Sequence, residues 1–211
     1  MPRNTPDSRF WDKIARKYAA DPVKDMEGYA RTLDRTRHYL HATDDVLELG
    51  CGTGSTALKL APHVSRILAT DFSAEMIGIA REKAAAEGCG NAEFAVAGPE
   101  RAPWPDGSFD AVLAFNLLHL VEDRRSAHAH VHRVLKPGGL FISKTPCLAE
   151  MNPLIRLALP VMQLVGKAPY VAIFSAGALE REIEAAGFSI VERARHGSGR
   201  KDTRIFIVAR K

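Results

Sequence analysis

The residues best placed to do chemistry form a glycine loop behind an apolar run. The run Val46–Leu49 is typical of a buried parallel strand, and Gly50, Gly52 and Gly54 follow it at alternate positions. Glycine lets a ligand lie against the backbone, and the exposed N–H groups of such a loop can bind an anionic group such as a carboxylate. We therefore expect this loop to hold the charged end of a ligand.

The next apolar run of the sequence ends in an acidic residue. Asp71 ends the segment Ala69–Asp71, and a carboxylate at the end of the neighbouring strand can accept hydrogen bonds from ribose hydroxyls. Loop and acid together indicate a ligand that carries a nucleoside. The dinucleotide fingerprint needs a third glycine where this chain has Ser55, so a nicotinamide-dependent dehydrogenase is the less favoured alternative.

The loop, with Glu48 ahead of its first glycine, closely resembles the first motif of class I S-adenosylmethionine (SAM) methyltransferases. The resemblance continues through Asp71, Pro105–Asp110 and Leu135–Gly139, in the order and spacing of the small-molecule, UbiE-like (methyltransferase type 11) branch. It covers about residues 40–145. It implies SAM as the methyl donor and S-adenosyl-L-homocysteine as the product.

The resemblance also implies how the cofactor is held. The backbone of the loop suits the amino acid end of SAM, with Cys51 as a small spacer, and Asp71 suits the ribose diol. Glu48 is expected to hold the methionine ammonium, directly or through water, with a bracing role as the alternative. Phe72 and Met76 either flank the adenine or belong to the core.

One segment departs from the family pattern. Many relatives carry Asp-Ala where this chain has Gly98 and Pro99, and that Asp receives the adenine amino group. Here the contact must come from the backbone, from water or from Glu100. Near the N-terminus, Tyr18 is the candidate aromatic residue that caps the cofactor; its stripe of apolar neighbours could equally be a packing surface.

The segment after the strand 109–115 is expected to lie in the crevice at the carboxyl edge of the sheet. Asn116 is a further candidate for cofactor binding, and His119 is a candidate general base, with a loop or capping histidine as the alternative. The segment lacks the Pro-Pro motif of adenine and glutamine amino-methyltransferases, which lowers the weight of that substrate class. A base is not required, because the sulfonium methyl is already activated and the protein mainly aligns donor and acceptor.

No metal is expected. His128 and His132 share one face of a predicted helix, while His130 points elsewhere, and no neighbouring acid completes a metal site. The sequence predicts that these histidines lie on a solvated helix face.

The elements that must position these residues alternate between strands and helices. This pattern predicts an α/β, Rossmann-like fold, with helices on both faces of a mostly parallel sheet; the resemblance implies seven strands, the last antiparallel. The expected strands are 45–49, 66–70, 92–97, 109–115, 139–144, 189–195 and 203–209, and the expected helices 7–19, 26–40, 54–61, 74–87, 122–135, 151–165 and 176–186. The turn Lys136–Gly139 should separate the helix 122–135 from the strand behind it.

We expect one methyltransferase domain over residues 1–211: N-terminal cap helices (1–42), a SAM-binding core (43–145), a substrate lid insert (146–175) and a C-terminal helix with a hairpin (176–211). The insert is apolar on most sides, so it must be buried, paired in a homodimer or used as a pocket wall; a membrane-surface role is a further alternative. As a lid it would favour a small hydrophobic or aromatic acceptor.

Composition limits the remaining classes. The 211 residues carry a net charge of +4, a mild excess that predicts either solvated faces or a steering patch. A nucleic-acid methyltransferase is therefore an unfavoured alternative. The polar N-terminus, the lack of a transmembrane run and three scattered cysteines favour a reducing cytoplasm. A regulatory protein that binds SAM without turnover is the alternative from another class.

Overall fold

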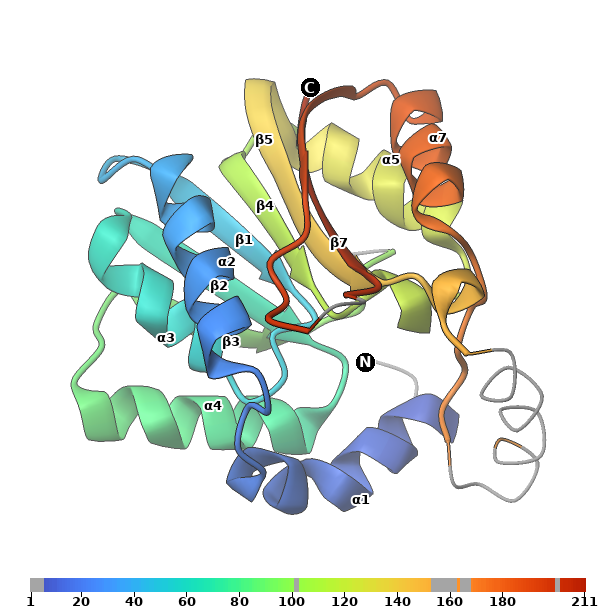
Figure 1. Cartoon of the computed structure of the whole chain (residues 1–211). Helices are drawn as coiled ribbons and strands as arrows, with labels where there is room; N and C mark the ends of the chain where they lie inside the picture. The colour runs from blue at the N-terminus through green and yellow to red at the C-terminus, as the bar shows by residue number, and fades with distance from the viewer. Residues whose placement is uncertain (1–5, 101–102, 153–162, 164–167, 200–201) are drawn as a thin grey trace.

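A seven-stranded sheet forms the centre of the computed structural model, which describes residues 6–100, 103–152, 163, 168–199 and 202–211 (Figure 1). The strand order is β3-β2-β1-β4-β5-β7-β6. The strands are β1 (Asp45–Leu49), β2 (Arg66–Asp71), β3 (Ala92–Val96), β4 (Phe109–Phe115), β5 (Leu135–Pro146), β6 (Ser189–Ala194) and β7 (Arg204–Arg210).

The sheet is mixed. β1 pairs in parallel with both β2 and β4, whereas β7 runs antiparallel to both β5 and β6. The chain leaves β1 toward one side of the sheet and returns to its other side at β4. Such a change of direction opens a crevice at the carboxyl ends of the strands, where ligands of α/β folds bind.

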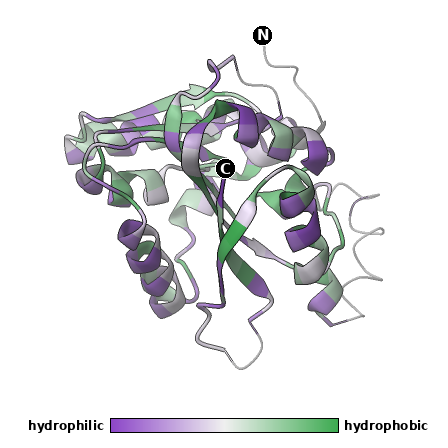
Figure 2. Ribbon diagram, turned by 90° about the horizontal axis from the view of Figure 1, so that it is seen from above, coloured by the Kyte–Doolittle hydropathy of each residue, from purple (hydrophilic) through white to green (hydrophobic). Residues whose placement is uncertain are grey.

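Helices cover both faces of the sheet, which explains why its central strands are almost wholly apolar (Figure 2). One core cluster joins the sheet to α5 and α7, and a second joins it to α2, α3 and α4. The helices are α1 (Pro6–Ala20), α2 (Met26–His38), α3 (Ser55–Leu60), α4 (Ala74–Glu87), α5 (Arg124–Val134) and α7 (Ala176–Ala185). None of the described helices is long and apolar enough to cross a membrane.

Helix α1 lies along α4 rather than on the sheet (Figure 1). Trp11 and Ala15 pack against Met76 of α4. The carboxylate of Asp12 accepts hydrogen bonds from the hydroxyl of Ser73 and from the amide of Glu75 at the first turn of α4, where a negative charge is favourable. These contacts place α1 beside the carboxyl edge of the sheet.

The predicted fold class is confirmed, and most element ends agree within two residues. The predicted turn Lys136–Gly139 is wrong, because the structure includes it in β5: Leu135 already pairs with Phe109 across an irregularity in the ladder. The predicted insert helix 151–165 lies outside the described residues except at Met151, Asn152 and Gln163.

The prediction of a solvated histidine face is also wrong. His128 is 1% exposed and His130 is 6% exposed. The ring of His128 packs edge-on against Phe141 of β5, and that of His132 against Phe188. Burial lowers the pKa of His128 to about 4, so the ring is neutral at physiological pH and serves as core.

Candidate functional site

A cavity of about 120 Å³ opens at the carboxyl ends of β1, β2 and β4. Most of the predicted cofactor-binding residues surround it. They are Tyr18, Glu48, Gly50, Cys51, Gly52, Asp71, Phe72, Met76 and Asn116. Because these residues come from four separate stretches of the chain, their meeting at one cavity depends on the whole sheet.

Asp71 is held rigidly at the edge of this cavity. Its Oδ2 accepts a hydrogen bond from the Gly52 amide (3.0 Å), and its Oδ1 accepts one from the Ser73 amide (2.9 Å). Burial raises the pKa of Asp71, and the two amides oppose that rise. Each carboxylate oxygen has a second lone pair, so a ribose diol can still donate to it.

Gly52 shows why the loop needs glycine. Its φ of +54° is a conformation that side chains disfavour, and a Cβ there would lie 3.7 Å from Cε1 of Tyr18. The Tyr18 ring therefore lies close over the loop, edge-on to Trp11 with 6.0 Å between ring centroids. Tyr18 is nevertheless 48% exposed, as expected for a side chain at a cavity mouth.

Glu48 has the least usual environment of the site. It is 2% exposed, and its Oε2 has no hydrogen-bond partner in the described part of the chain. Burial, together with the negative charge of Asp71, raises its pKa to about 8. A buried carboxyl oxygen without a partner is costly, so a cationic ligand group would be stabilised beside it.

The residues fit the amino acid and ribose parts of SAM. The unpartnered oxygen of Glu48 suits an ammonium, and the remaining lone pairs of Asp71 suit a diol. The fit for adenine is less complete. Phe72 and Met76 line the cavity, but Gly98 and Pro99 do not, and nothing lies within 4 Å of a Cβ built on Gly98.

The residues that line the cavity differ from the predicted site in two further ways. Gly54 is the N-cap of α3 and faces Phe94 and Ala80 rather than the cavity. Several residues that line the cavity were missed by sequence reasoning: Trp11, Thr56, Phe115, Leu117 and Leu120. Trp11 could have been found because it recurs at helical spacing with the candidate Tyr18, whereas the others resemble ordinary core or helix residues.

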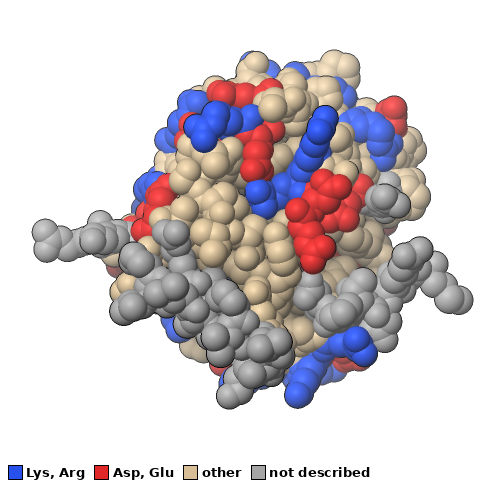
Figure 3. Space-filling model, turned by 90° about the vertical axis from the view of Figure 1, so that its right-hand side faces the viewer, with Lys and Arg blue, Asp and Glu red and all other residues tan. Residues whose placement is uncertain are grey.

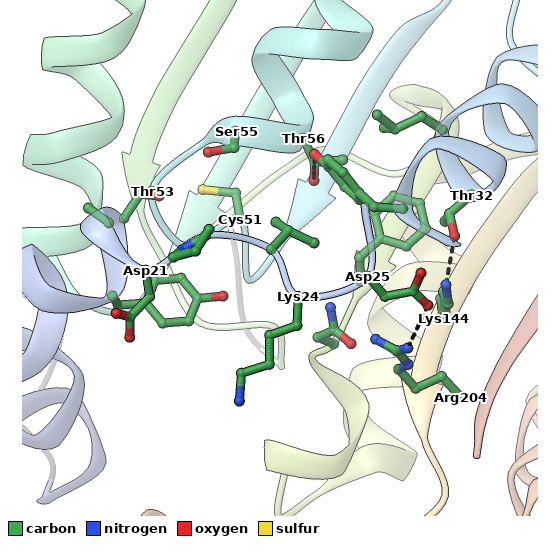
Figure 4. Close-up of a pocket in the computed structure, with 18 residues that line it drawn as sticks. Asp21, Lys24, Asp25, Thr32, Cys51, Thr53, Ser55, Thr56, Lys144 and Arg204 are labelled. Carbon is green, nitrogen blue, oxygen red and sulfur yellow. Dashed lines mark hydrogen bonds and ion pairs between the residues drawn. The ribbon is translucent and has the colours of Figure 1, made fainter. Parts of the chain in front are cut away.

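A second, larger cavity of about 420 Å³ adjoins the first (Figure 4). The two share wall residues at their junction: Tyr18, Cys51, Thr56, Phe115 and Asn116. The larger cavity extends beneath the α1–α2 loop toward Tyr29 of α2, Lys144 of β5 and Arg204 of β7. The hydroxyl of Tyr29 lies 3.1 Å from that of Thr56, which closes one side.

Asn116 stands where the two cavities meet. Its φ of +53° is the only left-handed value of a non-glycine residue in the described part of the chain. Its amide donates to the carbonyl of Lys144 (2.7 Å), which fixes this backbone at the end of β4. Such strain collects at functional sites, because surrounding contacts must maintain it.

The structure does not bring His119 to either cavity. Its Nδ1 lies 3.2 Å from the hydroxyl of Thr145, and its carbonyl accepts a hydrogen bond from Ala172 (2.8 Å). Burial lowers the pKa of His119 to about 4. Its role as a base stays a prediction. Among the aromatic residues outside the cofactor cavity, Tyr29 lines the larger cavity, while Phe174 and Trp104 pack into the core.

Basic and acidic side chains are interspersed over the face shown in Figure 3. Among the described residues, Arg124 pairs with Glu182 (2.8 Å) and Arg195 with Glu150 (2.7 Å), so basic side chains are matched by acids. On this face the excess of basic residues therefore does not form a patch of one sign.

Comparison with known proteins agrees with this geometry. Residues 46–139 match the family model described as a methyltransferase domain, the segment that holds the glycine loop, Asp71 and β4. The fold, the site and this match support a class I SAM-dependent methyltransferase. SAM is the cofactor of that class.

Particular relatives resemble the same segment. The chain is 38% identical over 104 residues to the ubiquinone/menaquinone biosynthesis C-methyltransferase UbiE of Francisella tularensis, an alignment that spans 47% of this chain and 42% of the relative. It is 37% identical over 97 residues to the uncharacterized methyltransferase YcgJ of Bacillus subtilis, over 46% of this chain and 38% of the relative. The chain thus matches less than half the length of these curated relatives.

Solved structures extend the likeness beyond that segment. The YcgJ crystal structure from Bacillus subtilis superposes with a TM-score of 0.67 and 25% identity, over 78% of this chain and 72% of that one. A SAM-dependent methyltransferase from Thermotoga maritima, described as a "possible histamine N-methyltransferase", superposes with a TM-score of 0.72 and 21% identity. It covers 96% of this chain and 99% of that chain, and at this identity it shows the fold alone.

Proposed function

We propose that this protein transfers the methyl group of SAM to a small acceptor held in the larger cavity. The observation that carries the proposal is the shared wall of the two cavities at Asn116. A donor bound at Glu48 and Asp71 and an acceptor bound beneath the α1–α2 loop would meet there. The sulfonium of SAM supplies an activated methyl group, so the protein's main task is alignment.

The cofactor roles follow from the contacts of each residue. Glu48 would hold the ammonium at its unpartnered Oε2, and Asp71 would accept from the ribose diol while it holds the Gly52 amide. Tyr18 and Trp11 would cover the site on the side of α1 and limit the access of water. The base role of His119 would require a movement toward the junction of the cavities.

The acceptor is proposed to have a hydrophobic or aromatic body. Val23, Tyr29, Leu33 and Phe115 give the larger cavity apolar walls. The name of the UbiE relative, which states C-methylation in quinone biosynthesis, points to the same kind of body, although the alignment spans 42% of that relative. These walls favour a small molecule with an apolar part, while polar residues such as Thr53 and Asn116 line the rest of the cavity.

Two measurements test the proposal. Calorimetric titration with S-adenosylhomocysteine should show binding near micromolar, with NADH as the control that should not bind. A screen of aromatic acceptors with methyl-labelled SAM should then show label transfer. Tight binding of S-adenosylhomocysteine without transfer to any acceptor would favour a regulatory SAM-binding protein, and preference for NADH would overturn the cofactor.

A further inference from the structure

Lys144 lies at the inner end of the larger cavity, where a lysine is unexpected. It belongs to β5, pairs in the sheet with Phe115, and is 6% exposed. Its side chain lines the cavity beside Thr32 of α2 (Figure 4). Lysine is almost never so buried without a charged partner, because removing its ammonium from water is costly.

The ammonium of Lys144 has few partners. It donates to the hydroxyl of Thr32 (2.7 Å), and the carbonyl of Gly28 lies at 3.5 Å. Among the described residues no carboxylate lies within ion-pair distance of its Nζ. An ammonium has three N–H donors, so at least one has no strong acceptor within the protein. Burial, together with nearby Arg204, lowers the pKa of Lys144.

The two nearest acids are engaged elsewhere. Asp25 accepts from the amides of Gly28 (2.9 Å) and Ser198 (3.0 Å), so it caps α2 and holds the loop before β7. Asp202 accepts from the side chain of Arg204 (3.1 Å), whose other end reaches Asp25. Neither carboxylate forms an ion pair with Lys144, although the charges of both act on its ammonium at longer range and oppose the fall of its pKa.

The cavity therefore combines apolar wall residues with a buried ammonium that has no direct ion pair among the described residues. Lys24 also lines the cavity, but at an exposed position. The apolar wall residues line the same cavity as Lys144 and Asn116, whose backbones are joined by the hydrogen bond at the end of β4. A molecule that fills this space would place one end against the ammonium and the other near the proposed methyl donor. An anionic end would satisfy the remaining donor through a direct ion pair, in a site where a charge-assisted hydrogen bond is strong.

We propose that the acceptor carries an anionic group, a carboxylate, that binds the ammonium of Lys144 while its apolar body reaches toward Asn116. The inference rests on the proposed function and narrows its substrate class. The competing explanation is purely structural: Lys144 would only anchor α2 through Thr32. That role predicts a loss of stability when the lysine is removed, and no preference for an anionic ligand.

Matched pairs of acids and amides distinguish the two roles. The probes are 4-hydroxybenzoate and 4-hydroxybenzamide, indole-3-acetate and indole-3-acetamide, and hexanoate and hexanamide. Their binding is measured by ligand-observed NMR at pH 7 on protein saturated with S-adenosylhomocysteine. In the parent protein at least one acid should bind about tenfold more tightly than its amide, as expected for a hydrogen bond to a charged group.

Three variants assign that preference to its source. Lys144→Met removes the ammonium and should reduce the preference to within about twofold. Thr32→Val removes the hydrogen bond between Thr32 and Lys144 but leaves the charge of Lys144, so the preference for the acid should remain. Lys59→Met, at an exposed position of α3, makes the same change in net charge and should also retain it. If Lys144→Met does not fold, Lys144→Gln takes its place.

Each outcome decides the inference. It is overturned if no acid binds better than its amide in the parent protein, including the case where no probe binds, or if the preference survives in Lys144→Met. Failure of this inference can be told apart from failure of the proposed function. If only the inference fails, the parent protein still binds S-adenosylhomocysteine and transfers a methyl group. If the proposed function fails, the parent protein binds no S-adenosylhomocysteine or transfers no methyl group to any acceptor.

Discussion

The amide of Gly52 donates to Oδ2 of Asp71 at 3.0 Å, so the glycine loop after β1 and the acid that ends β2 are joined directly. The other oxygen of Asp71 accepts from the Ser73 amide, just before α4 begins. One carboxylate thereby fixes the loop and the entry to α4. In the proposed site the same group, already held in place, binds the ribose, so little ordering remains to be done when the cofactor arrives.

Asp71→Ala should weaken the binding of S-adenosylhomocysteine by roughly 100-fold or more, because two hydrogen bonds to a charged group are lost. Asp71→Asn keeps the shape of the side chain but removes its charge, so this variant should also lose a large part of its affinity for S-adenosylhomocysteine. Glu87→Ala, an exposed acid at the end of α4, is the control and should bind normally. Isothermal calorimetry provides the measurement, with circular dichroism to establish folding. Unchanged affinity in a folded Asp71→Ala protein would remove Asp71 from the site.

Glu48 should link cofactor binding to proton release. Its pKa of about 8 means that the carboxyl is mostly protonated at pH 7, whereas an ammonium partner requires the ionised form. Binding of S-adenosylhomocysteine at pH 7 should therefore release close to one proton. Calorimetry in phosphate and in Tris measures this release from the difference in apparent enthalpy. Glu48→Gln should abolish it, and equal enthalpies in both buffers for the parent protein would contradict the proposed contact.

The same residue makes stability depend on pH in a defined direction. The folded-state pKa of about 8 lies above the ordinary value of 4.5, so between these values the folded protein binds a proton that the unfolded chain has lost. The contribution of Glu48 is full below about pH 4.5 and is lost as the pH rises toward 8. In urea titrations, the difference in unfolding free energy between Glu48→Gln and the parent protein should therefore grow in favour of the variant from pH 5 to 8.

Much of this architecture could be predicted because its signals are local. The strands β1, β2 and β4 are short apolar runs, and α4 carries its own cap at Ser73 and its stop at Gly88. The glycine loop and Asp71 are likewise recognisable by residue type and spacing. Where the signal lies within a few neighbouring residues, sequence and structure agree.

The larger cavity could not be predicted, since its charged end depends on distant contacts. Lys144 and Thr32 are 112 residues apart in the chain and meet only when α2 packs on β5. The burial of the α5 histidines could not be predicted for a related reason, because it depends on residues outside the helix. A polar residue type favours exposure, but Phe141 of β5 and Phe188 cover the rings of His128 and His132 from outside the helix.

Gly54→Ala should destabilise the protein through packing rather than through the cofactor site. The φ of Gly54 is +76°, and a Cβ there would lie 2.7 Å from Cε1 of Phe94 and 2.8 Å from Cβ of Ala80. Left-handed backbone and overpacking together should cost roughly 2–4 kcal/mol of unfolding free energy. The reason is geometric: Gly54 is the N-cap of α3, so the start of the helix cannot move away from the core without moving the loop.

Gly78→Ala is the matched control for this substitution. Gly78 lies within α4, and nothing is within 4 Å of a Cβ built on it. Alanine there should stabilise the helix by about 0.5–1 kcal/mol, because glycine loses more backbone freedom on folding. Urea unfolding of both variants at one pH separates the two effects. Equal urea midpoints for Gly54→Ala and the parent protein would mean that Phe94 can move aside. The packing around residue 54 would then not be the reason for its glycine, and ligand binding by the loop would be the remaining explanation.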